Sequence, residues 1–132
     1  MKDGPLSRRT KSFALQVIHF VGTLPSNRTV DILCKQLLRS ATSVGANYRA
    51  GCRARSKADF INKLCIVEEE ADECLYWLDL LMQSGLSRSA LTSALSKEAN
   101  EIVAMVVVSI KSTRATSRHV TPNSALRTPN SV

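Results

Sequence analysis

The stretch VDILCKQLLRSATSVGANY, residues 30–48, decides the fold because its apolar residues recur at helical spacing. They are separated by three, four, four, three and four positions, which is the pattern of an amphipathic helix packed along its whole length. This seam consists of Val30, Leu33, Leu37, Ala41, Val44 and Tyr48. We expect a long helix here, with Ser26 or Asn27 as its N-cap and its end near Cys52.

The same spacing predicts three further helices. A first helix is expected from about Ser12 to Gly22. A third begins after Ser56 as N-cap and stops at Gly85, and a fourth runs from about Ser89 to Thr113. The β-prone run IVAMVVV, residues 102–108, follows a helical pattern without a break and has no evident partner strand, so we assign it to the fourth helix.

Proline occurs only at positions 5, 25, 122 and 129, which leaves residues 26–121 available for long helices. We therefore expect an all-α fold, an up-down-up-down four-helix bundle over residues 1–115. Residues 116–132 contain two Pro and many Ser, Thr and Asn without periodicity, and we expect a disordered C-terminal tail there. No apolar run approaches the ~18–20 residues of a membrane span and no secretory signal is visible, so a cytoplasmic location is expected.

Charge is segregated along the chain. Residues 1–57 contain 11 Lys and Arg against 2 Asp and Glu, residues 58–86 contain 1 against 7, and residues 87–132 contain 6 against 2. The net charge is +7, with a pI of about 9.6. Such a balance favours polyanionic partners, either nucleic acid or an acidic protein surface.

The basic residues of the helix expected over residues 27–52 share one side of it. At 100° per residue they span about 80°, opposite the apolar seam. This basic stripe consists of Arg28, Lys35, Arg39, Arg49 and Arg53. Asp31 is the only carboxylate between Gly4 and Ala58, so the stripe is not neutralised within its own helix. An ordinary solvated face would show the same stripe, but the absence of acids favours neutralisation by phosphates or by another acidic surface.

The basic residues nearest the turn before the third helix are the freest to reach a ligand. We take Arg53, Arg55 and Lys57 as the first candidates for contacts with nucleic-acid phosphates, and Arg28 and Lys35 as the next. A stripe about 37 Å long, from the 1.5 Å rise of a helical residue, can follow several phosphates of a backbone.

A second face of the third helix indicates an oligomer interface. It holds four residues spaced by four, three and four positions, namely Ile66, Glu70, Glu73 and Trp77. Large apolar residues on a flank mark either contact with another subunit or a wider core face. The two glutamates can accept hydrogen bonds from Arg39 or Arg49 of an adjacent subunit. If so, part of the basic stripe is structural.

The sequence contains no pattern that indicates catalysis or a metal site. No Walker loop, GxSxG, HExxH or dinucleotide fingerprint is present, so we expect no enzymatic activity and no cofactor. The cysteines lack CxxC spacing and lie far from both histidines, which favours small apolar core residues over metal ligands. Among the small and polar residues of the second helix, Ser40, Ser43 and Asn47 are interpreted as a motif for close helix packing.

Three segments resemble the bacterial four-helix-bundle family of 23S rRNA intervening-sequence proteins. They are LLRSATSVGANYRAGCRARSKADFINKL at 37–64, EADECLYWLDLL at 70–81 and EANEIVAMVVVSIKSTR at 98–114. The combination of RSxxSxxAN, a helix start containing FI and an E…W helix is specific. The family pattern falls on Arg39, Ser40, Ser43, Asn47 and Glu73. The family commonly has Glu where this chain has Ala50, a departure that leaves a cation unpaired if that Glu pairs with a neighbouring Arg.

The resemblance implies a small cytosolic bundle that assembles into a ring, typically a homopentamer. Some relatives are encoded in inserts within ribosomal RNA genes, and others resemble the basic accessory protein of diversity-generating retroelements, which works with a reverse transcriptase. We therefore expect a non-enzymatic homo-oligomer that binds nucleic acid, structured RNA first, through its backbone, as an accessory factor to a nucleic-acid enzyme. The alternative is a protein–protein adaptor or scaffold whose basic stripe docks an acidic protein surface.

Overall fold

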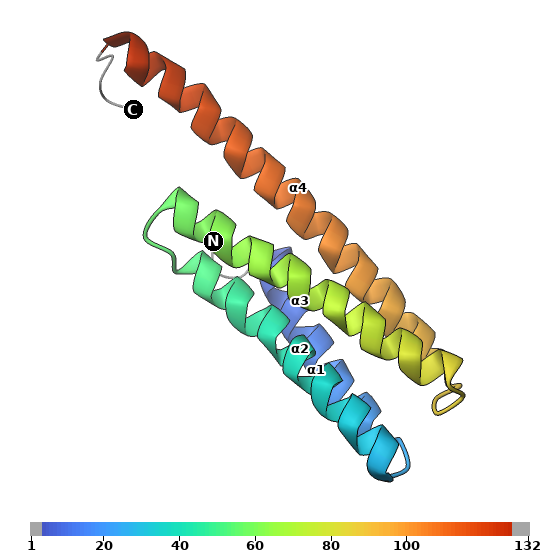
Figure 1. Ribbon diagram of the computed structural model, residues 1–132. Helices are drawn as coiled ribbons and strands as arrows, with labels where there is room; N and C mark the ends of the chain where they lie inside the picture. The colour runs from blue at the N-terminus through green and yellow to red at the C-terminus, as the bar shows by residue number, and fades with distance from the viewer. Residues whose placement is uncertain (1–3, 128–132) are drawn as a thin grey trace.

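The computed structural model describes residues 4–127, and describes side chains as far as Thr116. These residues form four helices joined by short connections and contain no strand: α1 (Pro5–Gly22), α2 (Arg28–Cys52), α3 (Lys57–Gln83) and α4 (Ala90–Arg127). Successive helices pack side by side in alternating directions, and α1 also packs against α4 (Figure 1). The all-helical prediction is confirmed, and the arrangement agrees with an up-down-up-down bundle.

Local sequence signals set the bounds of α2 and α3. The Asn27 side chain accepts a hydrogen bond from the Val30 amide at 2.9 Å, and the Ser56 hydroxyl accepts one from the Asp59 amide at 3.0 Å. Each N-cap satisfies an amide that has no partner inside its helix. After α3, Gly85 has φ of 78°, a left-handed conformation that glycine adopts without a steric penalty.

Two helix ends differ from the sequence prediction. α1 begins at Pro5 rather than near Ser12, because Pro is well tolerated at the first helical position. This earlier start buries Leu6 and Thr10. α4 continues past Thr113 to Arg127, where the pattern predicts a tail from residue 116, since extending an existing helix needs no new nucleation. The end of the predicted tail, residues 128–132, lies outside the described residues.

The core follows the bundle axis and contains the predicted seams. In the seam of residues 30–48 every member is buried except Leu33, which packs half-buried against the core. The corresponding apolar positions of α3 are buried at Leu64, Val67, Ala71, Cys74 and Leu78, half-buried at Phe60 and Leu75, and 36% exposed at Met82. Each large aliphatic side chain buried in this way stabilises the fold by roughly 1.5–3 kcal/mol.

Close approach of α2 and α3 near their connecting turn depends on Gly51. A Cβ at this position would lie 3.2 Å from Lys63 Cβ and 3.3 Å from the Leu64 side chain. The missing side chain lets the end of α2 pack directly against the start of α3. This contact positions the basic turn formed by residues 53–57.

Candidate nucleic-acid interface

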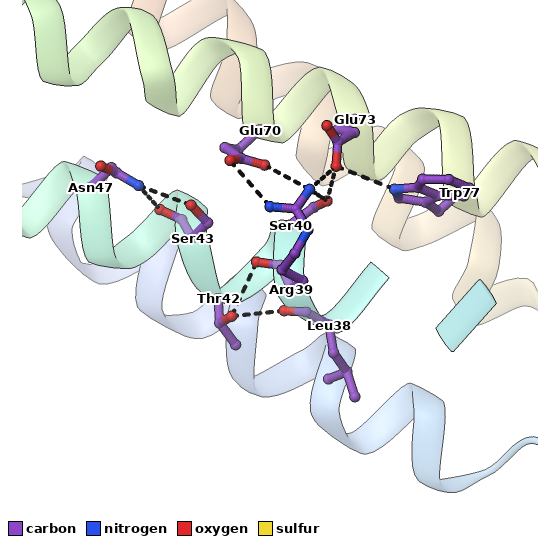
Figure 2. A network of polar contacts seen from close by, with 9 residues as sticks. All are labelled: Leu38, Arg39, Ser40, Thr42, Ser43, Asn47, Glu70, Glu73 and Trp77. Carbon is purple, nitrogen blue, oxygen red and sulfur yellow. Dashed lines mark hydrogen bonds and ion pairs between the residues drawn. The ribbon is translucent and has the colours of Figure 1, made fainter. Parts of the chain in front are cut away.

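A polar cluster joins α2 to α3 at the middle of the bundle (Figure 2). We call it the Arg39 cluster; its members are Arg39, Ser40, Glu70, Glu73 and Trp77. The buried Ser40 hydroxyl donates to Glu73 Oε1 at 2.6 Å, and the Trp77 indole donates to the same oxygen at 3.5 Å. Arg39 pairs with Glu73 and lies 3.5 Å from Glu70.

The contacts in the Arg39 cluster stabilise its charged groups. The hydrogen bond from Ser40, helped by Trp77 and Arg39, lowers the pKa of Glu73 against the opposing effect of desolvation. Attraction to Glu70 is the largest of the effects that raise the pKa of Arg39. Glu70 Oε1 is buried without a hydrogen bond and depends on its long ion-pair contact with Arg39. The positive charge of Arg39 is therefore paired with carboxylates of its own chain.

Within the chain, Glu70 and Glu73 both contact Arg39, because that residue lies on the flank of α2 that faces α3. Hydrogen bonds to these glutamates from an arginine of an adjacent subunit stay a prediction. Arg49 takes no part in the cluster. Trp77 packs half-buried against the core, as the interpretation of a widened core face predicts.

The remaining residues predicted for the oligomer interface and for the packing motif of α2 have different surroundings. Ile66 is half-buried on α3. Ser40 is fully buried, in keeping with a packing role. Asn47, however, donates to the carbonyl and the hydroxyl of Ser43 on its own helix, both at 2.9 Å. The described contacts of Asn47 therefore hold α2 to itself rather than to a neighbouring helix.

The remaining basic residues of α2 and the following turn differ from Arg39. All are exposed, and within the part of the chain that the structure describes none forms an ion pair with a carboxylate: Arg28, Lys35, Arg49, Arg53, Arg55 and Lys57. They are distributed along the outer side of α2 and its C-terminal turn. Exposed cations without a protein partner are available to an anionic ligand.

An open groove lies between the start of α1 and the end of α2. Its volume is about 830 Å³. Three cationic residues line it, Lys11 from α1 and Arg49 and Arg53 from α2, and no carboxylate among the described residues does so. The sequence pattern did not indicate Lys11, because it placed the start of the first helix at Ser12. Pro5, a favoured first helical residue, was the signal that would have included it.

Small and polar residues form the rest of the groove. Ala14, Gly45 and Ala46 lie on its walls, and α1 and α2 approach so closely that a Cβ at Gly45 would lie 3.4 Å from the Thr10 carbonyl oxygen. The Tyr48 ring is buried, and burial, followed by the nearby Cys52 thiol, raises the pKa of Tyr48 to about 12. The phenol is therefore neutral at physiological pH and adds no negative charge to the groove.

A second ion-pair cluster ties α1 to α4. Arg9 donates to Glu98 at 2.5 and 2.9 Å and to Glu101 at 2.6 Å. These hydrogen bonds raise the pKa of Arg9, and the bond to Glu98 has the larger effect. The hydrogen bond from Arg9 in turn lowers the pKa of Glu101. Arg9 is thereby neutralised, although it is only two positions from Lys11.

The described residues contain no group of His, Cys, Asp and Glu arranged to hold a metal ion. Cys34 and Cys74 are buried, which raises the pKa of both thiols, that of Cys74 to about 12. Their burial agrees with the prediction that cysteines serve as small core residues. Within the same part of the chain, no helix combines the length and apolar character that a membrane crossing requires.

Comparison with known proteins identifies related chains. Residues 3–108 match the family described as 23S rRNA-intervening sequence protein. A crystal structure of a protein of unknown function from the S23 ribosomal protein family of Bacteroides thetaiotaomicron is similar, with 34% sequence identity and a TM-score of 0.75. The similarity covers 80% of this chain and 98% of that one. No curated protein matches the chain.

Proposed function

The chain belongs to the family of 23S rRNA-intervening sequence proteins, and on that premise we propose that it is a non-enzymatic, homo-oligomeric protein that binds structured RNA through the phosphate backbone. The resemblance found in its central segments is thereby confirmed. In this proposal the protein acts in the cytoplasm as an accessory factor to a nucleic-acid enzyme. A reverse transcriptase is one such partner.

The observation that carries the proposal is the division of the basic residues into two groups. Arg39 is neutralised by α3, whereas the exposed cations of α2 and its C-terminal turn have no carboxylate partner among the described residues. Because Glu70 and Glu73 are engaged by Arg39, these two acids of α3 do not compete for the rest of the stripe. Phosphates are ligands that match such a set of solvated cations.

Arg53, Arg55 and Lys57 are the first candidates for phosphate contacts. They lie at the α2–α3 turn, at one end of the bundle, where they are exposed. Arg28 and Lys35 lie on the first turns of the same helix, which extends the basic surface along α2. The aromatic content of 5% favours contacts with the backbone over base stacking.

Exposed apolar side chains support self-association. Large apolar residues that are at least half exposed occur on every helix: Leu15 and Ile18 on α1, Ile32 on α2, Tyr76 on α3 and Val108 on α4. Such residues on several sides of a small bundle match contacts with more than one neighbouring copy. We propose a ring, with a pentamer as the favoured form. Light scattering on the purified protein measures the subunit number directly.

Fluorescence anisotropy tests the RNA proposal. A labelled structured RNA and a DNA duplex are titrated with protein from about 50 to 300 mM salt, and affinity for RNA should fall with a log–log slope of about −0.7 to −0.9 per phosphate contacted. The variant R53E/R55E/K57E should bind RNA much more weakly and keep its subunit number. The control R88E/K111E/R114E has the same net charge but alters basic residues of the α3–α4 connection and α4.

Three results would contradict the proposal or part of it. Absence of RNA binding at the lowest salt would exclude it and favour an adaptor whose basic stripe docks an acidic protein. Equal loss of affinity in the two charge-reversal variants would show that net charge alone, not the α2–α3 turn, determines binding. Dissociation of the oligomer by R53E/R55E/K57E would assign those residues to a subunit interface.

A further inference from the structure

The groove between α1 and α2 differs from the rest of the basic surface because it is concave. Its volume of about 830 Å³ is within the range of ~300–1,000 Å³ typical of small-ligand sites and is far larger than a single phosphate needs. Its walls combine cations with small apolar residues. A site of this composition suits a ligand with an anionic part and a flat, weakly polar part.

We propose that this groove holds one unpaired nucleotide of the bound RNA. The inference rests on the proposed function, since the nucleotide belongs to the strand whose backbone the α2–α3 turn contacts. A paired nucleotide is held inside its duplex and cannot enter a groove between two helices, whereas an unstacked one can be turned out of the strand.

The cations of the groove come from both of its walls, and we assign them to the nucleotide's phosphate. Arg49 and Arg53 are one helical turn apart, about 6 Å along the α2 axis, and lie on the same side of the helix. Arginine presents a planar set of donors that binds phosphate through two hydrogen bonds, while Lys11 supplies a point charge from the α1 wall.

The hydroxyl groups of the groove fit the ribose. The Thr42 hydroxyl already donates its proton to the Leu38 carbonyl oxygen at 2.7 Å, so it is left to act as an acceptor. A ribose 2′-hydroxyl is a donor that can bind such an acceptor, and DNA lacks it. Ser7 adds a second hydroxyl at the start of α1.

The small residues of the groove leave space for the base. Ala14 and Ala46 present little side-chain volume, and Tyr48 is only 7% exposed, so its ring is not available for stacking. The base is then held by apolar contact and by the arginine guanidinium plane rather than by hydrogen bonds to its edges. We therefore expect little preference among the four bases.

Arg53 connects the groove to the α2–α3 turn. It lines the groove and is also the first of the three basic residues of the turn, followed by Arg55 and Lys57. An RNA strand whose paired part contacts the turn can continue into the groove. None of the described residues that line the groove is acidic, so the strand meets no negative charge there. The geometry thus favours a junction between paired and unpaired RNA as the preferred ligand.

The experiment compares a blunt RNA duplex with the same duplex carrying a single-stranded extension of about five nucleotides on each strand. The extended RNA should bind about tenfold more tightly, the effect of one charge-assisted hydrogen bond. Ala46→Leu adds an apolar side chain to the groove wall without altering charge, and should reduce this difference while leaving affinity for the blunt duplex unchanged. Ala104→Leu, an exposed alanine on α4, is the matched control and should keep the difference.

A second measurement needs no variant. Cys52 lines the groove and is half-buried, and Cys65 on α3 is half-buried outside it. Extended RNA should slow alkylation of Cys52 relative to Cys65, as mapped by mass spectrometry, and the blunt duplex should not. Protection of Cys52 by the extended RNA alone would support the inference even if a variant failed to fold.

The outcomes separate the two proposals. Equal affinity for blunt and extended RNA, with Cys52 equally reactive in both, would overturn the groove inference and leave RNA binding by the turn intact. Failure of both RNAs to bind at low salt would overturn the proposed function and this inference with it. An extended-RNA advantage that persists in full in Ala46→Leu would show that the unpaired strand binds elsewhere.

Discussion

Arg39 and Arg49 are the same residue type on the same helix, yet their surroundings are opposite. Arg39 contacts Glu70 and Glu73 and is held against α3. Arg49 lies ten residues further along, in a groove that no carboxylate of the described chain lines. The comparison shows that the basic residues along one side of α2 have two roles: some form ion pairs within the fold, and others are exposed to a ligand. The neighbouring helix determines which cations stabilise the fold and which are left for a ligand.

The same contrast occurs on α1 over a shorter distance. Arg9 binds Glu98 and Glu101 of α4, whereas Lys11, two positions later, lines the groove with α2. Two positions rotate a side chain by about 200° around a helix, so neighbours in sequence face different helices. The division between structural and available cations therefore follows helix geometry rather than local composition.

The largest expected effect is a loss of folding stability when the Arg39 cluster is disrupted. Glu73→Ala removes the acceptor of the buried Ser40 hydroxyl, the Trp77 indole and Arg39. Leaving a buried donor without a partner costs about 1–3 kcal/mol, so the free energy of unfolding in urea should fall by that amount. Glu69→Ala, an exposed residue on the same helix, should change it by less than about 0.5 kcal/mol. Equal losses would show that the Arg39 cluster contributes nothing specific.

The next effect is on RNA binding. Arg49→Gln should lower affinity and reduce the magnitude of the salt slope by about 0.7–0.9, the value for one phosphate contact. Arg39→Gln removes the same charge but should leave the affinity and the slope unchanged, because that charge is already paired. Anisotropy titrations of both variants across salt concentrations make the comparison. An identical loss in the two variants would contradict the division of the stripe.

A smaller effect is expected on α1. Arg9→Gln breaks the pairs with Glu98 and Glu101, which are only partly buried, and should lower the free energy of unfolding by about 1 kcal/mol or less. Lys11→Gln should leave stability unchanged. Urea unfolding of the two variants measures the difference. A larger loss for Lys11→Gln would mean that Lys11 has a structural partner.

The smallest effect is in the pH dependence of stability. The Ser40 hydrogen bond, with help from Trp77 and Arg39, lowers the pKa of Glu73 below its ordinary value of 4.5. A group whose pKa is lower in the folded state contributes stability above its unfolded pKa and loses it as pH falls through the folded pKa. The stability advantage of the wild type over Glu73→Gln should therefore be present at pH 7 and shrink below about pH 4.5. An advantage unchanged in acid would show that the ionised carboxylate is not responsible.

Much of the fold could be predicted from the sequence because its signals are local. The caps at Asn27 and Ser56, the stop at Gly85 and the seam of residues 30–48 each depend on residues within a few positions of one another. The start of α1 was missed because its first turns, PLSRRTK, carry a single large apolar residue, Leu6, and show no seam. Their helical state depends on packing of Leu6 and Thr10 against the bundle.

The candidate site was predicted less completely. The sequence pattern predicted that Glu70 and Glu73 accept hydrogen bonds from Arg39 or Arg49 of an adjacent subunit, and it did not indicate their contacts with Arg39 of the same chain. The groove was not anticipated, because its walls come from residues more than 30 positions apart, such as Lys11 and Arg49. Helical periodicity gives the phase of a residue on its own helix and contains no information on how two helices are placed around each other.

The sequence by itself determined that this protein is all-helical, where α2 and α3 begin and end, which faces enter the core, and that α2 has more basic residues than its one acid, Asp31, can neutralise. Those properties depend on periodicity, capping and composition, which are local. Only the tertiary structure decided which cations are paired, because an ion pair needs two side chains within about 4 Å. The distances between Arg39 and Glu73, or between Arg9 and Glu98, are set by packing of the whole bundle.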